Sequence, residues 1–204
     1  MTRQEIIYER VDEKELVLNA NEVAARLNVA RGYTSELIDK CEKMLRSELD
    51  CRFSAVKTSV LFPSEDKIDL GFGEFESHSL YRNLSGCREA FIFAVTVGHG
   101  VDRLLKKLSV TSVAEHFIAD GLASAFAEAA CDYADAKIKG GLKCRPRFSP
   151  GYGDLPLSIQ PDILLSVDAG KLLNITLGKT LLMSPMKSIT AIMGIETEGY
   201  TNSN

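Results

Sequence analysis

The sequence predicts a single α+β domain with an antiparallel or mixed sheet. Several short stretches alternate polar with apolar residues or run continuously apolar, as strands do, and one long helical pattern occupies residues 112–138. No repeat, Pro/Gly-rich linker or block of like charge divides the 204 residues. A chain of this length can bury roughly 70% of its unfolded surface, so a single hydrophobic core is feasible.

The N-terminal segment predicts one strand followed by two helices. Residues 4–10 fit a short strand or an extended arm, and residues 20–28 are helical in pattern. A second helix is expected to begin after Thr34, a good N-cap residue, with Glu36 favourably placed in the first turn. Its apolar residues recur at the spacing of one helix face: Leu37, Ile38, Cys41, Met44, Leu45 and Leu49.

The pattern then changes to period two. Residues 52–62 and 67–72 flank a turn-forming Pro-Ser-Glu-Asp sequence, so we expect a β-hairpin there. Residues 77–84 predict a short helix, and residues 90–98 form a continuous β-prone apolar run. Such a run is typical of a strand that is buried on both faces of its sheet.

The longest predicted element is a helix that follows a shorter one over residues 101–108. Ser112 and Glu115 form an S-x-x-E capping box, and the pattern continues until Gly140 stops it, which gives a helix about 40 Å long. This helix is rich in small residues: Ala119, Gly121, Ala123, Ala125, Ala127, Ala129 and Ala130. Small side chains allow either a packed sheet or a ligand to approach closely, and we favour the sheet.

The C-terminal third predicts a loop, a short helix, three strands and a flexible tail. In order, these are residues 144–156, 160–168, 172–178, 180–185, 187–195 and 197–204. The loop contains three prolines and two glycines, which explains why no periodic pattern continues through it.

Charge and cysteine usage narrow the class of protein. The 24 Lys plus Arg against 28 Asp plus Glu give a net charge of −4, and no basic stripe indicates a nucleic-acid partner. The N-terminus lacks the apolar core of a signal peptide, and no stretch approaches ~20 apolar residues, so we expect no membrane partner. Five widely spaced cysteines without a C-x-x-C motif favour a reduced, cytoplasmic protein.

Motifs of known chemistry are largely missing. The three histidines, His78, His99 and His116, have no second His or Cys at metal-ligand spacing, so we predict no metal site. The G-x-G sequences at 71–73 and 98–100 lack the third glycine of a dinucleotide-binding loop. There is also no P-loop and no G-x-S-x-G, and we predict no catalytic residue in this chain.

The loop sequence Arg-Phe-Ser-Pro-Gly-Tyr-Gly-Asp at 147–154 carries the most chemistry. Arg147 offers a planar guanidinium to a carboxylate, Gly151 lets the backbone approach a ligand, and Tyr152 adds a flat ring with a hydroxyl. A small zwitterion suits such a loop, with Glu128 or Asp120 accepting its ammonium group. The alternative is a surface arginine beside a structural turn.

Three segments of the chain resemble the activation domain of cobalamin-dependent methionine synthase, and in particular its short, free-standing forms. They are RFSPGYGDLPLSIQ (147–160), LMSPMKSITAIMGI (182–195) and DGLASAFAEA (120–129). The resemblance covers most of residues 85–195, and it implies an activation-like domain over 1–196 with residues 1–50 as a helical lead-in. It also implies a twisted, largely antiparallel sheet flanked by helices, one of them long and rich in small residues.

The resemblance implies a function and a set of ligand-binding residues. In that family the domain binds S-adenosylmethionine and donates its methyl group to cobalamin that has been oxidised by accident, once a flavodoxin-type donor supplies an electron. Arg147 would hold the methionyl carboxylate, and Tyr152 would lie near the ligand. Gly151 and the backbone of Ser149 would line the adenosyl part. Glu128, with Asp120 as a weaker candidate, would bind the amino group.

The same resemblance makes the chain one component of a methyltransferase system that is not catalytic alone. It has no D-x-H-x-x-G corrinoid-binding motif, so the cobalamin would be held by a separate protein or a truncated methionine synthase. One alternative is an interaction module that caps a corrinoid protein without binding the ligand. It is motivated by Met193, which stands where the family has a tyrosine, and by the absence of tryptophan. A third hypothesis is a sensor that binds the ligand and transfers nothing.

Overall fold

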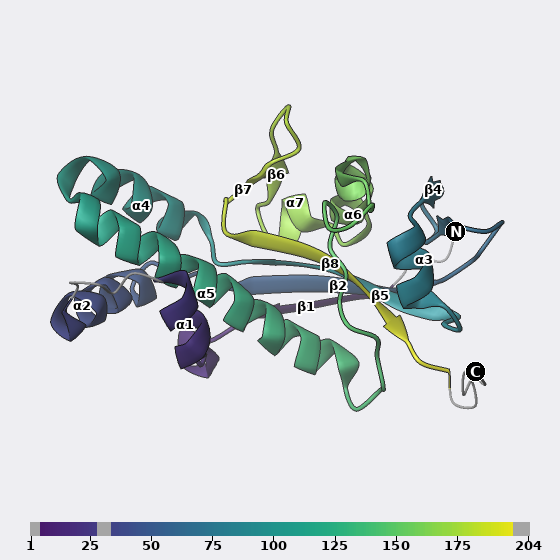
Figure 1. Ribbon diagram of the computed structural model, residues 1–204, viewed down its shortest axis with the longest axis horizontal. Helices are drawn as coiled ribbons and strands as arrows, with labels where there is room; N and C mark the ends of the chain where they lie inside the picture. The colour runs from purple at the N-terminus through teal and green to yellow at the C-terminus, as the bar shows by residue number, and fades with distance from the viewer. Residues whose placement is uncertain (1–4, 28–33, 198–204) are drawn as a thin grey trace.

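The computed structural model describes residues 5–27 and 34–197, which form an α+β domain around a four-stranded antiparallel sheet (Figure 1). The strand order is β1-β2-β5-β8, so β5 is central and β8 lies at one edge. The bounds are Ile6–Arg10 for β1, Arg52–Ser59 for β2, Glu89–Thr96 for β5 and Ser188–Ile195 for β8. This architecture confirms the predicted fold class.

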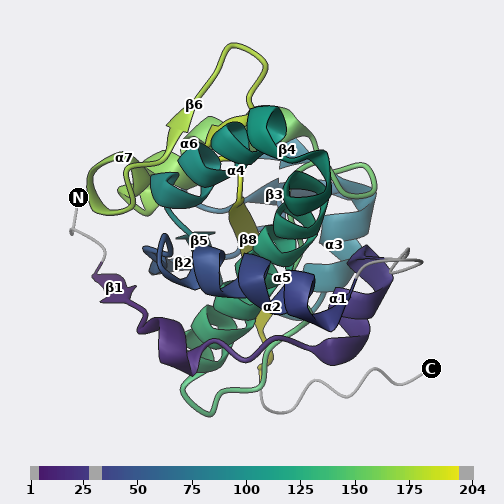
Figure 2. The same ribbon diagram turned by 90° about the vertical axis from the view of Figure 1, so that its left-hand side faces the viewer.

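Four helices cover one face of the sheet (Figures 1 and 2). They are α1 (Ala20–Arg26), α2 (Ser35–Arg46), α4 (His99–Thr111) and the 27-residue α5 (Val113–Lys139). Thr34 caps α2 and Ser112 caps α5, each by accepting a backbone N–H bond, and left-handed Gly140 ends α5, all as predicted. The small residues of α5 let it pack directly on β2, β5 and β8, which explains their abundance.

Shorter elements cover the opposite face. They are α3 (His78–Leu84), α6 (Gln160–Ser166), α7 (Ala169–Leu172), and the two-stranded sheets β3–β4 (Lys67–Asp69 and Glu74–Glu76) and β6–β7 (Thr176–Leu177 and Met183–Ser184). Short 3₁₀ turns at Glu13–Glu15 and Leu157–Ile159 complete the described structure. Alternating residues of β5 divide between the two cores, with Phe91 and Phe93 facing α5 and Ile92 and Ala94 facing α6.

Two predicted strand arrangements are wrong. Residues 52–62 and 67–72 do not form one hairpin, because both edges of β2 are already paired, with β1 and β5, which leaves β3 to pair with β4. The two segments are linked instead by an isolated bridge between Leu61 and Asp69 and by a hydrogen bond of 2.9 Å from the Thr58 hydroxyl to the Leu70 carbonyl. Further along, the strand expected at 172–178 begins as helix α7 and retains only β6.

Most of the remaining predicted elements lie where expected, although the strand predicted at 180–185 retains only the two residues of β7. The strand at 90–98 is β5, buried from Ala90 onward, and the strand at 187–195 is β8. No helix in the described part of the chain is long and apolar enough to cross a membrane. Except for Thr197, the predicted tail at 197–204 lies outside the described residues, as do Gln4 and Asn28 at the ends of two predicted elements.

Candidate functional site: a pocket around the free edge of β8

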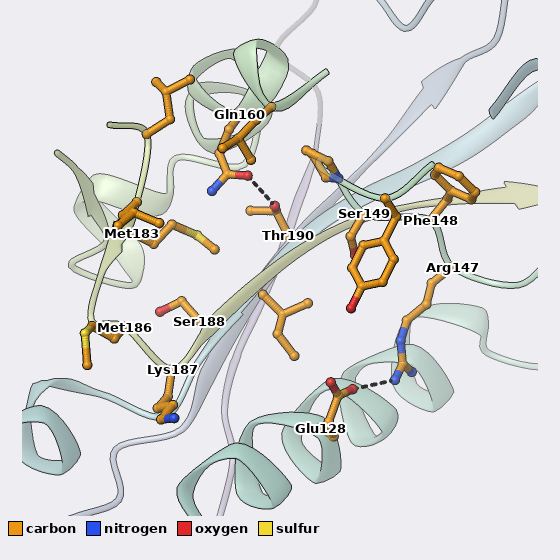
Figure 3. Close-up of a pocket in the computed structure, with 16 residues that line it drawn as sticks. Glu128, Arg147, Phe148, Ser149, Gln160, Met183, Met186, Lys187, Ser188 and Thr190 are labelled. Atoms are coloured by element: carbon orange, nitrogen blue, oxygen red, sulfur yellow. Dashed lines mark hydrogen bonds and ion pairs between the residues drawn. The ribbon is translucent and has the colours of Figure 1, made fainter. Parts of the chain in front are cut away.

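A cavity of about 810 Å³ lies at the edge of the sheet, where β8 has no neighbouring strand within residues 5–27 and 34–197 (Figure 3). Its walls come from α5, from the loop that follows α5, from α6 and from the turn between β7 and β8. The pocket therefore joins segments that are far apart in the sequence. Its lining residues are Glu128, Arg147, Phe148, Ser149, Pro150, Tyr152, Leu157, Gln160, Leu181, Leu182, Met183, Met186, Lys187, Ser188, Ile189 and Thr190.

The floor of the pocket is backbone of β8. Phe148 and Ile192 exchange both backbone hydrogen bonds at 2.8 Å, so the loop closes the C-terminal half of this edge. Successive residues of a strand direct their N–H and C=O groups to opposite edges, so those of Thr190 face the same edge as those of Ile192. No described residue bonds to the Thr190 backbone, and this donor and acceptor are open to a ligand.

Arg147 marks one end of the pocket and is surrounded by carboxylates of α5. Its guanidinium lies 3.0 Å from Glu128 and 2.6 Å from Asp132. Glu128 also lies 3.5 Å from Arg26 of α1, so the N-terminal part of the chain reaches the site. The Arg147 and Glu128 side chains are 28% and 33% exposed, which leaves both accessible from the pocket. We call this pair the Arg147 end (Figure 3).

The loop that carries Arg147 and Tyr152 is fastened to α3 by Asp154. The Asp154 carboxylate accepts hydrogen bonds from the Ser77 hydroxyl and from the backbone N–H groups of His78 and Ser79 at 2.7–3.1 Å. These bonds hold the pKa of Asp154 well below its usual range, chiefly through Ser77, so the carboxylate is ionised at neutral pH. Gly153 has φ +56°, and an added Cβ would lie 3.0 Å from Ser79 Oγ, so this close approach favours glycine.

Lys187, the residue before β8, also lines the pocket. Its ammonium nitrogen is 2.8 Å from Asp120 and 2.9 Å from the Ser124 hydroxyl, both on α5. The turn before it is also fixed, because the backbone N–H of Met186 donates to Asp102 at 2.9 Å. Lys187 therefore joins β8 to the long helix beneath the pocket.

Gln160, the first residue of α6, marks the other end (Figure 3). Its side chain is 3% exposed, and its Oε1 lies 3.3 Å from Thr190 Oγ1. Apolar side chains from Leu157, Met183 and Ile189 line the space between this Gln160 end and the Arg147 end. The pocket thus offers an apolar middle with polar groups at both ends, a common design for small-molecule sites.

The structure brings together four of the six residues proposed from the sequence. Arg147, Ser149, Tyr152 and Glu128 line the pocket, whereas Gly151 and Asp120 lie outside its lining. Sequence reasoning missed Gln160 and Lys187, which lie inside the two segments quoted for the family resemblance but match no chemical motif.

Three further features of the described residues were candidates for a functional role: Met193, the Cys131 thiol and the possible metal ligands. Met193 is fully buried on the α5 side of the sheet and does not reach the pocket. Burial raises the pKa of the Cys131 thiol, beneath Arg147, to about 12, so it is neutral at physiological pH. Within residues 5–27 and 34–197, no group of His, Cys, Asp and Glu is arranged to hold a metal ion.

The comparisons with known proteins bear on the fold. No protein-family model matches this sequence, and no curated protein does either. Among solved structures, the crystal structure of the MetH reactivation domain bound to AdoHcy superposes with a TM-score of 0.73. The match covers 99% of this chain and 82% of that chain, at 13% sequence identity. The chain therefore has the fold of the MetH reactivation domain.

Proposed function

We propose that this chain binds S-adenosylmethionine and S-adenosylhomocysteine in the β8 pocket, as the reactivation component of a cobalamin-dependent methionine synthase. The single observation that carries the proposal is the Arg147–Glu128 pair at the mouth of a cavity of about 810 Å³. The fold supports it, because the similar MetH domain was solved with AdoHcy bound. Cobalamin would be carried by a separate protein.

The Arg147–Glu128 pair matches the amino-acid part of such a ligand. An α-amino acid has a carboxylate and an ammonium group on one carbon, and this pair offers a guanidinium and a carboxylate 3.0 Å apart. Binding would exchange one ion pair within the protein for two between protein and ligand. Asp132 would continue to hold the guanidinium in place at 2.6 Å. Arg147 therefore needs little reorganisation to bind.

The proposed methyl transfer requires the protein to position the ligand, and it requires no acid–base catalysis. The bound ligand would supply a sulfonium methyl group to a reduced corrinoid on the partner protein. The methyl carbon would form a bond to the corrinoid while its bond to sulfur breaks, and the electron pair of that bond would stay on sulfur as the neutral thioether leaves. A flavodoxin-type protein would supply the electron that reduces the corrinoid. No proton moves in this displacement, so the pocket needs only to bind the ligand, orient it and exclude water.

A second candidate function is a module that caps a corrinoid protein and binds no nucleotide. It is favoured by the full set of carboxylates around Arg147, namely Glu128, Asp132 and Asp135, which leaves the guanidinium paired without a ligand. It predicts capture of a corrinoid protein that is indifferent to S-adenosylmethionine. The two functions therefore differ in a single binding measurement.

Isothermal titration with S-adenosylmethionine and S-adenosylhomocysteine tests the proposal. We expect saturable binding of both ligands, with affinity reduced about 10- to 100-fold in Arg147→Ala, since a charge-assisted hydrogen bond contributes about 1.5–3 kcal/mol. Arg145→Ala is the matched control, because Arg145 lies two residues away and pairs with Glu196 outside the pocket lining. Its affinity should equal that of the wild type.

Two results would contradict the proposal. Absence of binding at millimolar ligand would favour the capping module. Binding that is equally strong in the wild type, Arg147→Ala and Arg145→Ala would place the ligand elsewhere on the protein.

A further inference from the structure

The Gln160 end of the pocket holds an amide group whose nitrogen has no acceptor among the residues that the structure describes. Gln160 is only 3% exposed, and the Thr190 hydroxyl donates a hydrogen bond to its Oε1 at 3.3 Å. No described residue accepts a hydrogen bond from its amide nitrogen, which points away from Thr190, on the side of Met183 (Figure 3). The nitrogen is not one of the fully buried polar atoms that lack a partner, so it is reached from the pocket, where a ligand can accept its hydrogen bond.

In this structure the amide presents its N–H₂ group to the pocket, so it offers a ligand a hydrogen-bond donor. Because Oε1 already accepts from Thr190, the remaining free group is the N–H₂. The backbone holds Gln160 in position as well. Its N–H donates to the carbonyl of Leu157, the first residue of the preceding 3₁₀ turn, and Pro161 restricts the first turn of α6.

The free edge of β8 adds an acceptor beside this donor. The backbone C=O of Thr190 faces the pocket without a partner among the described residues, and the side chain of the same residue contacts Gln160. The Gln160 end therefore offers both an amide donor and a carbonyl acceptor, from two residues whose side chains are in contact. Met183, Ile189 and Leu157 provide the apolar walls that a flat ring would need.

We infer that Gln160 is a specificity-determining residue that selects an adenine base in this pocket. This inference rests on the proposed function. The edge of adenine carries an acceptor, N1, beside an amino donor, N6, which complements the Gln160 amide and the Thr190 carbonyl. Hypoxanthine presents the reverse pattern, with N1–H as donor and O6 as acceptor. With its N–H₂ group toward the pocket, the Gln160 amide therefore complements adenine better than hypoxanthine.

Titration of S-adenosylhomocysteine and S-inosylhomocysteine tests the inference. The wild type should bind the adenosyl compound about 10- to 100-fold more tightly, since a matched base edge gives discrimination of this order. Gln160→Leu should bring the two affinities within about threefold. Gln160→Glu, whose carboxylate only accepts hydrogen bonds, should favour the inosyl compound.

Two controls separate recognition from folding. Gln160→Leu leaves the Thr190 hydroxyl unpaired, so the double variant Gln160→Leu/Thr190→Val removes both partners and keeps the fold testable by thermal unfolding. It should lose discrimination as Gln160→Leu does. Arg147→Ala should weaken both ligands equally and leave their ratio unchanged, since Arg147 lies at the other end.

Each outcome is decisive. If S-adenosylhomocysteine binds but the ratio between the two ligands is unaffected by every Gln160 variant, the inference is overturned and the proposed function stands. If S-adenosylhomocysteine does not bind the wild type at all, the proposed function fails and the inference fails with it.

Discussion

The two faces of the sheet are built for different tasks. The face under α5 is a continuous core, in which one long helix with small side chains packs directly on β2, β5 and β8. The opposite face is covered by short helices, and around the free edge of β8 the two faces meet in a pocket whose ionic groups are partly exposed. Stability should therefore depend mainly on the first region, and ligand binding on residues whose loss the fold tolerates.

The largest expected loss of stability follows from Phe126→Ala on α5. Phe126 is fully buried in the α5-side core, and the Arg46 guanidinium lies 4.9 Å from its ring centre. Removing such a ring should lower the free energy of unfolding by about 3–5 kcal/mol, which urea denaturation can measure. Phe117→Ala is the matched control, because Phe117 lies on the same helix and is 42% exposed. A similar loss in both variants would contradict the division between the two regions.

Arg147→Ala should have a much smaller effect on stability. Its ion pairs with Glu128 and Asp132 are partly solvated, so the free energy of unfolding should fall by less than about 1 kcal/mol. Arg147→Ala should nevertheless reduce the affinity for S-adenosylmethionine and S-adenosylhomocysteine strongly. The one variant thus separates ligand binding from stability. If denaturation shows a loss as large as that of Phe126→Ala, the two tasks are not separable at this residue.

The smallest expected effect is a local loss of stability where Asp154 attaches the loop of Arg147 and Tyr152 to α3. The pKa of Asp154 is lower in the folded protein than its value of about 3.9 in the unfolded chain. Its hydrogen bonds therefore stabilise the fold fully at any pH well above that unfolded-chain value, and this stabilisation is lost as the pH falls through the folded-state pKa. At pH 7, Asp154→Asn should speed hydrogen exchange at the Ser79 amide, which donates to this carboxylate. Exchange in α5 should stay unchanged. Equal exchange at Ser79 in both proteins would show that the carboxylate does not hold the loop.

The predictable parts of the fold are those determined by neighbours in the sequence. Thr34, Ser112 and Gly140 mark helix ends through bonds or backbone angles that span only a few residues, and the structure confirms each of them. The hairpin prediction failed because strand pairing is a competition over long range. The turn between β2 and β3 has suitable residues, but β5 and β1 occupy both edges of β2.

The site shows the same division. The conformationally restricted loop around Arg147 and Tyr152 stands out in the sequence, and four proposed residues line one pocket in the structure. Gln160 and Lys187 belong to α6 and β8, and their position depends on where those elements pack. The role inferred for Gln160 depends on an amide nitrogen that has no acceptor among the described residues, a property of the folded structure that no sequence motif marks.

Mapping of amide chemical shifts in ¹⁵N-labelled protein during titration with S-adenosylhomocysteine tests the central claim most directly. We predict saturable shifts along Ser188–Thr190, in the loop from Arg147 to Tyr152 and at Gln160, with little change in α2 and α4. Shifts centred on α2 and α4, or none at millimolar ligand, would contradict the claim that the pocket around the free edge of β8 is the ligand site.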